Sequence, residues 1–460
     1  MPFVPHTVAD EQAMLEEIGV AQLQDLFDEI PSHLASGQLQ QVPEGISEMA
    51  MLQKLRARAE QDNGYVCFLG GGSYDHHIPS AVWDLTTRGE FMTAYTPYQA
   101  EASQGTLQLI YEYQSMMARL TAMDISNASV YDGASGLAEA VLMALRANKK
   151  NKSKSVWIAE SVHPHYVQAT RNIVTNQGVR IVPLALNDQG IVDLQALGSV
   201  ESEVPAAVVV QQPNFFGSIE AVDALTDWAH ELGILVIAVV NPMTLAVLKP
   251  PGEWGETGAD IVCGDGQPLG VPMASGGPSF GFMCCRENFV RQMPGRIIGR
   301  TVDLDGKPGY TLTLQAREQH IRRGKATSNI CTNQGLLVTA GTIYMSIVGP
   351  QGLREVAAQS YLSAKALRER LCAVPGVERF FDHPCFHEFS LKLAVPANAV
   401  LERMQARGIL AGLALQDFSQ LDGADHGILV ATTEKRTADE LDRYVDAFGE
   451  VMAALTEEGA

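Results

Sequence analysis

Apolar residues near the start of the chain recur every three or four positions until a proline ends the pattern. This spacing predicts amphipathic helices within residues 7–60, because positions three or four apart share one face of a helix. Pro31 stops the run, since proline lacks a backbone donor. We therefore expect residues 1–60 to form a helical arm that precedes the main domain. The recurring apolar positions are Met14, Leu15, Ile18, Leu23, Leu26, Phe27 and Ile30.

From about residue 106 the chain alternates between helix-like and strand-like segments. Helical spacing predicts helices over residues 106–120 and 137–147, and short apolar runs predict strands. Such alternation is typical of a mostly parallel sheet covered by helices on both faces, so we expect an α/β fold. The predicted strands are residues 155–158, 180–183, 206–211, 234–240, 261–263 and 280–284.

The pattern changes after Gly349. A long amphipathic helix is predicted over residues 353–373, followed by fewer strands and further helices, which is typical of a smaller α+β domain. We therefore expect a large domain over residues 61–345 and a small C-terminal domain over residues 346–460, closely packed because no Pro/Ser-rich linker separates them. The remaining predicted elements are strands 386–393 and 427–431 and helices 397–407 and 437–455.

Composition and charge exclude several classes of protein. The chain of 460 residues has 46% hydrophobic residues and a formal net charge of −20, which leaves no broad basic surface for nucleic acid. The longest strongly apolar stretch, residues 234–240, is far short of the ~20 residues that a membrane helix needs. The acidic N-terminus also lacks a signal pattern. We expect a cytoplasmic protein that binds neither nucleic acid nor membrane.

Cysteine and histidine spacing gives no sign of a disulfide framework or a metal site. The seven cysteines are scattered, and only Cys284 and Cys285 are adjacent. The pairs His76-His77 and His163-Pro164-His165 lack a second cluster with ligand spacing. We expect buried cysteines and no metal.

A turn rich in glycine and hydroxyl groups precedes the predicted helix 137–147. Gly133, Ala134 and Ser135 lie where free amide groups and the helix dipole favour an anion such as a phosphate. The same residues are equally consistent with a helix that Asp132 or Ser135 caps. The residues alone leave both interpretations open.

The strand 261–263 runs into the polar loop Gly264-Asp265-Gly266-Gln267. In this pattern it resembles the strand end that carries the cofactor-binding lysine in pyridoxal-phosphate enzymes of the aspartate-aminotransferase fold. Gln267 stands at that place, and no lysine occurs between Lys249 and Lys307. Asn241 likewise stands where that fold has an aspartate that keeps the pyridine nitrogen protonated. The alternative is that this was never a cofactor site and that Asn241-Pro242 ends a strand in a turn.

Two further segments carry groups suited to a polar ligand. Residues 93–105 have too few aliphatic residues to be core, and residues 322–330 place three cations before a hydroxyl-rich turn. The alternatives are a surface loop and a solvated charge run. The candidate residues are Tyr95, Tyr98, Gln99, Glu101, Ser103, Gln104, Lys325, Thr327, Ser328 and Asn329.

Several strings, in the same order along the chain, resemble the P-protein family, the pyridoxal-phosphate-dependent glycine decarboxylases of the glycine cleavage system. The similarity runs nearly from end to end. It is carried by Pro5-His6-Thr7, Ile18-Gly19-Val20, Thr96-Pro97-Tyr98-Gln99, Ser103-Gln104-Gly105, Tyr131-Asp132-Gly133-Ala134, Gln212-Pro213-Asn214-Phe215-Phe216-Gly217, Gly264-Asp265-Gly266-Gln267 and Lys325-Ala326-Thr327-Ser328-Asn329-Ile330-Cys331.

This resemblance implies a large domain of pyridoxal-phosphate transferase fold type I and explains the missing lysine. In the two-subunit form of the family, a separate homologous chain bears the lysine, and the two chains assemble as α2β2. The resemblance thus implies the non-lysine subunit of an oxidoreductase complex that decarboxylates glycine and passes its aminomethyl group to the lipoyl H-protein. Pyridoxal phosphate would be held covalently by the partner, and the isolated chain would be inactive.

The resemblance also implies how this chain takes part, since enzymes of this fold build active sites at dimer interfaces. The candidates of residues 93–105 would reach the partner's site. In related cysteine-desulfurase-like enzymes a threonine turn reaches the neighbour's cofactor phosphate, and residues 325–329 look similar, although Ser328 stands where that turn has proline. Two rival hypotheses remain: an autonomous fold-type-I enzyme that uses another lysine, and a non-catalytic regulatory or scaffold homologue.

Overall fold

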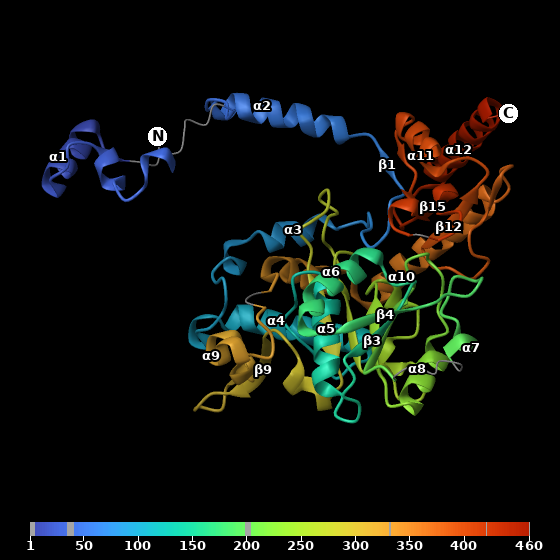
Figure 1. Cartoon of the computed structure of the whole chain (residues 1–460), viewed down its shortest axis with the longest axis horizontal. Helices are drawn as coiled ribbons and strands as arrows, with labels where there is room; N and C mark the ends of the chain where they lie inside the picture. The colour runs from blue at the N-terminus through green and yellow to red at the C-terminus, as the bar shows by residue number, and fades with distance from the viewer. Residues whose placement is uncertain (1–4, 35–40, 198–203, 331–332, 420, 460) are drawn as a thin grey trace. The chain divides into compact units, whose positions relative to one another are not determined.

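A computed structural model of the chain describes residues 5–34, 41–197, 204–330, 333–419 and 421–459 (Figure 1). The chain separates into two compact units, residues 1–63 and residues 64–460. Cys331 of the last sequence string lies outside the described residues.

Within its described residues, 5–34 and 41–63, the first unit has two α-helices and the short 3-10 helices η1 (Leu23–Phe27), η2 (Ser32–Leu34) and η3 (Glu60–Asp62). Helix α1 (Val8–Ile18) begins at a capping box of Thr7 and Asp10, which satisfies backbone donors of its first turn. Helix α2 (Glu48–Ala59) begins at Ser47. Among the described residues of this unit Leu15 is the one buried side chain. The helices predicted within residues 7–60 are confirmed.

The second unit is built on a seven-stranded sheet in the order β2-β8-β7-β6-β5-β3-β4. Neighbours from β4 to β7 pair in parallel, and β8 pairs antiparallel with both β7 and β2. The mostly parallel sheet is confirmed. The strands are β2 (Ile125–Ser126), β3 (Ser155–Ala159), β4 (Arg180–Leu184), β5 (Ala207–Gln212), β6 (Leu235–Val240), β7 (Ile261–Asp265) and β8 (Gly281–Cys285).

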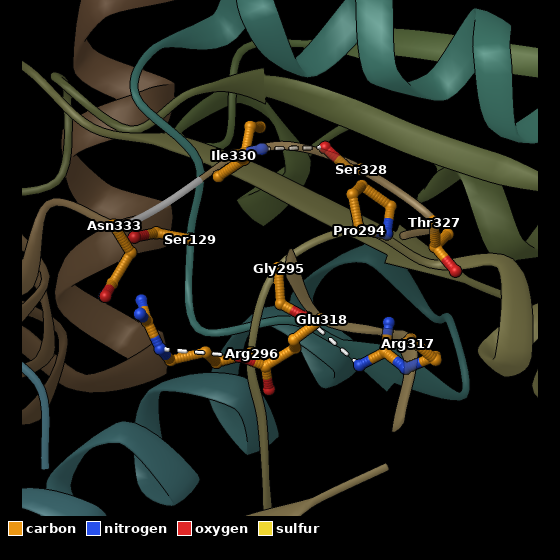
Figure 2. Close-up of a pocket in the computed structure, with 10 residues that line it drawn as sticks. All are labelled: Ser129, Pro294, Gly295, Arg296, Arg317, Glu318, Thr327, Ser328, Ile330 and Asn333. Carbon is orange, nitrogen blue, oxygen red and sulfur yellow. Dashed lines mark hydrogen bonds and ion pairs between the residues drawn. The ribbon is translucent and has the colours of Figure 1, made fainter. Parts of the chain in front are cut away.

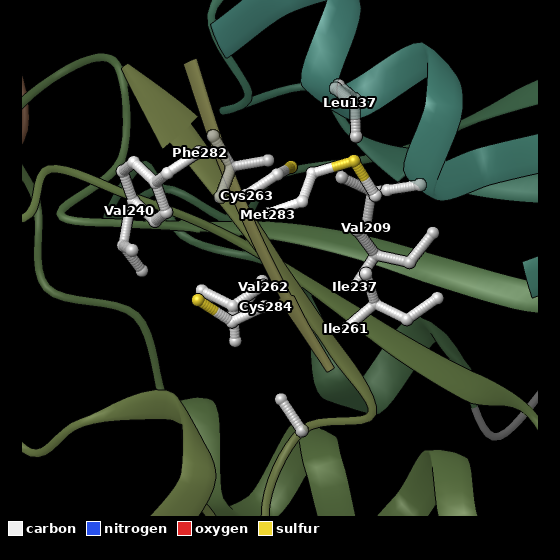
Figure 3. Close-up of a cluster of buried hydrophobic side chains, with 14 of the residues drawn as sticks. Leu137, Val209, Ile237, Val240, Ile261, Val262, Cys263, Phe282, Met283 and Cys284 are labelled. Atoms are coloured by element: carbon white, nitrogen blue, oxygen red, sulfur yellow. The ribbon is translucent and has the colours of Figure 1, made fainter. Parts of the chain in front are cut away.

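Apolar residues cross the sheet in register and form its core. Val209 pairs with Ile237, and Ile237 pairs with Ile261, so three branched side chains lie side by side (Figure 3). Leu137 of α5 belongs to the same buried cluster. Strands buried on both faces read as continuous apolar runs, which is why the sequence predicts them well. The helices of this part are α3 (Ser80–Thr86), α4 (Gln104–Thr121), α5 (Gly133–Ala147), α6 (Pro164–Val174), α7 (Leu194–Leu197) and α8 (Val222–Glu231).

A second, antiparallel sheet of order β11-β12-β15-β14 follows the long helix α10 (Gly335–Leu371). Strand β1 (Val66–Cys67) pairs in parallel with β13 (Ile409–Leu410), so the start of the second unit lies against its C-terminal part. Residues 64–460 cluster as one unit, and the boundary at residues 345 and 346 stays a prediction. The other elements are β11 (Val377–Arg379), β12 (Glu388–Leu393), β14 (Leu413–Ala414), β15 (Gly427–Ala431), α11 (Ala397–Ala406) and α12 (Ala438–Gly459).

Helix α10 begins well before the predicted start at residue 353. Its first half is apolar on most sides and lacks the polar stripe that reveals a surface helix. By length and composition alone α10 could cross a membrane. However, Gly349 breaks it with a φ of 62°, and Val338 and Leu367 lie in two separate buried clusters. These features make α10 a core helix that joins the two clusters.

An antiparallel hairpin of β9 (Ile297–Val302) and β10 (Pro308–Thr313) was not predicted. It lies against α4, where the Gln104 amide holds it: Nε2 donates to the Tyr310 carbonyl at 2.9 Å, and Oε1 accepts from the Tyr310 N–H at 2.9 Å. The short helix α9 (Gln319–Arg322) follows. Arg296, directly before β9, and Glu318, directly before α9, belong to the second site described below.

Candidate functional sites

The carboxyl ends of β5, β6 and β7 form the first candidate site, which we call the strand-end site. Open α/β sheets bind ligands at this edge. A small cavity of about 30 Å³ lies there. It is lined by Gly72, Tyr74, His163, Tyr166, Gln211, Val239, Val240, Asn241, Asp265 and Pro268.

Gln267 lies beside this cavity, buried, and its side-chain amide is fully hydrogen-bonded. Its Oε1 accepts from the Tyr74 N–H at 2.8 Å, and its Nε2 donates to the carbonyls of Tyr74 and Val271 at 2.9 and 2.8 Å. An amide can both accept and donate in this way, whereas an ammonium can only donate. Gln267 therefore anchors the segment around Tyr74 to the loop after β7.

Two carboxylates occupy the start of α5. Asp132 caps the helix by accepting from the Ser135 N–H at 2.7 Å. Asp265 accepts from the Gly133 N–H at 3.2 Å and from the Gln267 N–H at 2.9 Å, and it also accepts from the Ser279 hydroxyl. A phosphate bound at a helix start needs these free amides, and nearby carboxylates repel it. The negative charge that this helix start favours is supplied by the chain itself.

Neutral groups line the rest of the strand-end site. Asn241 accepts from the Met243 N–H at 3.0 Å, and its Nδ2 lies 3.4 Å from the Nε2 of His387. Burial lowers the pKa of His387 to about 3 and that of His163 to about 4. The His163 ring stacks on Tyr166 at a centroid distance of 5.1 Å. At neutral pH neither histidine carries a charge.

These residues do not fit pyridoxal phosphate. Gln267 provides no amine for a covalent bond, Asn241 cannot balance a protonated pyridine nitrogen, and Asp265 sits on the amide that would face the phosphate. The space of about 30 Å³ is also far smaller than the roughly 300 Å³ at which ligand pockets begin. The chain's own side chains occupy the strand-end site, and the site does not fit the cofactor.

The second candidate site is a small cavity of about 20 Å³ between the β9–β10 hairpin and the segment before α10 (Figure 2). We call it the Arg296 site. Its lining comes from segments far apart in the sequence, with contacts that join Arg296 to Glu318, Arg317 to Gly295 and Ser328 to Ile330 (Figure 2). The lining residues are Ser129, Pro294, Gly295, Arg296, Arg317, Glu318, Thr327, Ser328, Ile330 and Asn333.

Arg296 contacts both Tyr98 and Glu318 although its side chain is only 7% exposed. Its guanidinium donates to the Tyr98 hydroxyl at 3.2 Å and lies 5.6 Å from the centre of the Tyr98 ring. Its Nε lies 3.9 Å from a carboxylate oxygen of Glu318, which pairs the two buried charges. His320 packs edge-on against Tyr98 at 5.4 Å. Arg296 holds the Tyr98 hydroxyl, while the Tyr98 residue stays 51% exposed.

Thr327 and Ser328 also line the Arg296 site. The Ser328 hydroxyl donates to Glu139 at 2.8 Å and accepts from the Ile330 N–H at 3.1 Å, which fixes the turn. The backbone of Thr327 donates to the Arg317 carbonyl at 3.0 Å. Burial raises the pKa of Glu139. The turn is thus held from both sides, and no described hydrogen bond uses the Thr327 hydroxyl.

The remaining sequence candidates are spread around this site. Tyr95 is 84% exposed, and Gln99 and Glu101 are also at the surface. Lys325 lines a neighbouring cavity together with Thr327. The other three candidates near this site are Asn329, which is exposed, Ser103, whose side chain makes no capping bond to α4, and Gln104, which holds the hairpin.

Sequence reasoning missed Arg296, Glu318 and Glu139. Arg296 follows a Pro-Gly pair in a stretch with no clear periodicity, and Glu139 lies on a helix whose apolar face gives no sign of a buried acid. Only the folded arrangement brings them to Tyr98 and Ser328.

Among the described residues no three histidine, cysteine or acidic side chains are arranged to hold a metal ion. In the same part of the chain the cysteines are unpaired, with Cys263, Cys284, Cys285 and Cys385 buried.

The chain is similar over nearly its whole length to proteins of one family. The family model "Glycine cleavage system P-protein" matches residues 1–448. The probable glycine dehydrogenase (decarboxylating) subunit 1 of Alcanivorax borkumensis is 58% identical over 455 residues, covering 98% of this chain and 100% of that protein. The protein with the same description from Nitrosomonas europaea is 56% identical, covering 99% and 100%.

Solved structures agree. A crystal structure of glycine decarboxylase (P-protein) of the glycine cleavage system, in inhibitor-bound form, superposes with a TM-score of 0.87 at 42% identity, covering 98% of this chain and 100% of that chain. The sphingosine-1-phosphate lyase of Burkholderia pseudomallei shares the fold at 15% identity, with a TM-score of 0.66 and coverage of 93% and 96%. The predicted fold type I is confirmed.

Proposed function

The chain belongs to the glycine cleavage system P-protein family, and from this premise we propose that it is the lysine-free subunit of a glycine decarboxylase. With a lysine-bearing partner chain it takes part in the decarboxylation of glycine and the transfer of the aminomethyl group to the lipoyl H-protein. The partner holds pyridoxal phosphate, the two chains assemble as α2β2, and the complex is cytoplasmic.

The observation that carries this proposal is that the Gln267 side chain is buried and fully hydrogen-bonded. Its amide is hydrogen-bonded at every polar atom to Tyr74 and Val271, and Asp265 covers the start of α5. A chain with this arrangement is stable as it stands and has no group with which to bind the cofactor covalently. Its contribution to turnover must come from elsewhere on its surface.

The Arg296 site is the best-built surface for that contribution. Tyr98 is held by Arg296 and stays 51% exposed, and Thr327 lies on a turn fixed by Ser328 and Glu139. We assign to these residues the role of completing the partner's active site, with Tyr95, Gln99, Glu101, Ser103, Gln104, Lys325 and Asn329 in the surrounding surface. The turn at residues 133–135 keeps only a structural role.

The proposal divides the chain into three parts. Residues 61–345 form the large domain that carries both candidate sites, and residues 346–460 form the small domain. Residues 1–60 form the arm.

The test is to express this chain alone, a lysine-bearing homologue alone, and both together, and to measure glycine-dependent carbon dioxide release with H-protein present. Activity is expected only when both chains are present. Release by this chain alone would show an autonomous enzyme and would refute the proposal.

Two variants separate this proposal from a scaffold role. In the assembled complex, Tyr98→Phe and Thr327→Ala are each expected to lower turnover about tenfold, the effect of losing one well-placed hydrogen bond. Tyr361→Phe, at a partly exposed tyrosine far along the chain on α10, serves as the matched control and should leave turnover unchanged. Full activity of both variants in an intact complex would favour the scaffold.

A further inference from the structure

One larger surface cavity shares residues with the Arg296 site, and a second shares a residue with the first. The first, about 390 Å³, is lined by Arg317 and Thr327, which also line the Arg296 site. The second, about 610 Å³, lies beyond it, and Arg291 lines both of these cavities. The three cavities therefore form one continuous track along the surface.

This track is rich in cations. Arg317 lines both the Arg296 site and the first larger cavity, and six further cations line the two larger cavities. We call these six the cationic band: Arg146, Lys149, Lys150, Arg291, Arg322 and Lys325. Lys149, Lys150 and Arg291 are exposed, as are Arg322 and Lys325. In the described ranges of the chain none of these five exposed cations forms an ion pair, so their charges face solvent.

Acidic groups are nearly missing from the same track. Asp260 is the one carboxylate that lines the two larger cavities, and it is already engaged: it pairs with His230 at 2.9 Å and accepts from the Val236 N–H at 2.8 Å. The chain has 53 acidic and 33 basic residues, so its net charge is negative, whereas the local charge of the cationic band is positive. Such a band produces a local positive potential that attracts anionic partners.

The two ends of the cationic band lie next to different parts of the chain. One end reaches the Arg296 site, and the other ends at the carboxyl end of α5, by Lys149 and Lys150. Both larger cavities are open and follow one another along the surface, which suits an extended partner surface better than one small molecule. The partly exposed Leu235 and Phe289 add apolar area to the second cavity. A polar rim with some apolar contact is the usual composition of a transient protein interface.

We propose that the cationic band is the docking surface for the acidic face of the carrier protein that receives the aminomethyl group. This inference rests on the proposed function, because a reaction that ends on a carrier requires that protein to dock next to the site which this chain completes. The band guides the carrier by long-range attraction, and the Arg296 site marks where its reactive arm arrives. Charges of this kind govern the association rate and its salt dependence more than the chemical step.

The test uses the assembled complex of this chain with its lysine-bearing partner and measures initial rates against carrier and against glycine. The variant is Lys149→Glu/Lys150→Glu, two exposed residues at the end of the band away from the Arg296 site. The matched control is Arg354→Glu/Lys365→Glu, two exposed cations on α10 that line none of the three cavities and change the net charge equally.

The band variant is expected to raise the carrier KM about fivefold or more at low salt, with kcat and the glycine KM unchanged, and to flatten the dependence of carrier kcat/KM on ionic strength. The control should leave the carrier KM as in the natural chain. An unchanged carrier KM in the band variant would overturn the docking proposal while leaving the proposed function intact. A change in the mass of the complex would also overturn it, since the band would then be a subunit contact. Absence of activity in the natural complex would instead refute the proposed function.

Discussion

At the scale of single residues, an amide in the place of an amine changes what the strand-end site can do. Gln267 makes three hydrogen bonds that use both its acceptor and its donors. A lysine at this position would leave the Tyr74 N–H without its partner, and burying an unpaired donor costs about 1–3 kcal/mol. The amide at position 267 is therefore coupled to the local structure around Tyr74.

This coupling predicts that Gln267→Lys lowers the free energy of unfolding by about 1–3 kcal/mol and yields no borohydride-reducible adduct with pyridoxal phosphate. Urea unfolding and mass spectrometry after reduction measure the two effects. Gln351→Lys, at an exposed glutamine on α10, is the control and should lie within about 0.5 kcal/mol of the natural chain. A reduced adduct at position 267 in a stable variant would contradict the account.

Glu388 is a second residue whose chemistry is set by burial. Its carboxylate accepts from the Gly71 N–H and the Tyr74 hydroxyl, each at 2.6 Å, but burial dominates and raises its pKa from 4.5 to about 7. The folded chain therefore holds this proton more tightly than the unfolded chain does. As the pH rises from 4.5 to 7 the unfolded state ionises first, so Glu388 lowers stability across this window by up to about 3 kcal/mol.

Urea unfolding at pH 5 and at pH 7.5 tests this, with the natural chain compared to Glu388→Gln. The variant removes the titration and is expected to lose less stability between the two pH values than the natural chain. Glu355→Gln, an exposed glutamate on α10, should follow the natural chain. Equal pH dependence in Glu388→Gln and the natural chain would refute the assignment.

At the scale of elements, the sequence predicts those parts whose burial leaves a regular pattern. Strands β3 and β5 to β8 are apolar runs that are largely buried, whereas the edge strand β4 is partly exposed. Each of these strands is predicted to within about two residues at either end. The hairpin β9–β10 was missed because polar residues around Arg300 and Thr301 give it no alternation, and its register depends on Gln104 from another element. The local sequence around the hairpin contains no information about Gln104, which is distant in the chain.

Gln104 is therefore predicted to set the order of the hairpin. Gln104→Ala removes both bonds to Tyr310 and should raise amide hydrogen exchange in β9 and β10, with a loss of about 1–2 kcal/mol in stability. The matched control is Gln108→Ala, one turn further along α4, where the amide only contacts Glu112 at the surface. Unchanged exchange in Gln104→Ala would show that packing alone holds the hairpin.

The candidate site, like the elements, was predicted only where the local sequence leaves a pattern. Tyr98, Thr327 and Ser328 were predicted because strings of polar residues in loops point to ligand contact, and the structure brings all three to the Arg296 site. Arg296 and Glu318 were missed because a buried ion pair between two loops leaves no local pattern. The roles of these residues in a partner's active site stay a proposal.

At the scale of the whole molecule, the family, the filled strand-end site and the cationic band give one consistent picture. The fold is that of fold type I enzymes, and Gln267, which the sequence predicts to stand at their lysine position, is hydrogen-bonded within this chain. Under the proposed function this chain acts through two surfaces, one that completes a partner's site and one that receives a carrier. Its measured activity should therefore depend on assembly and on salt.

The most direct measurement is to reduce the assembled, pyridoxal-phosphate-loaded complex with borohydride and to locate the modified lysine by peptide mass spectrometry. The account predicts a single adduct on the partner chain and none on any lysine of this chain. An adduct on this chain, together with glycine decarboxylation by this chain in isolation, would contradict it.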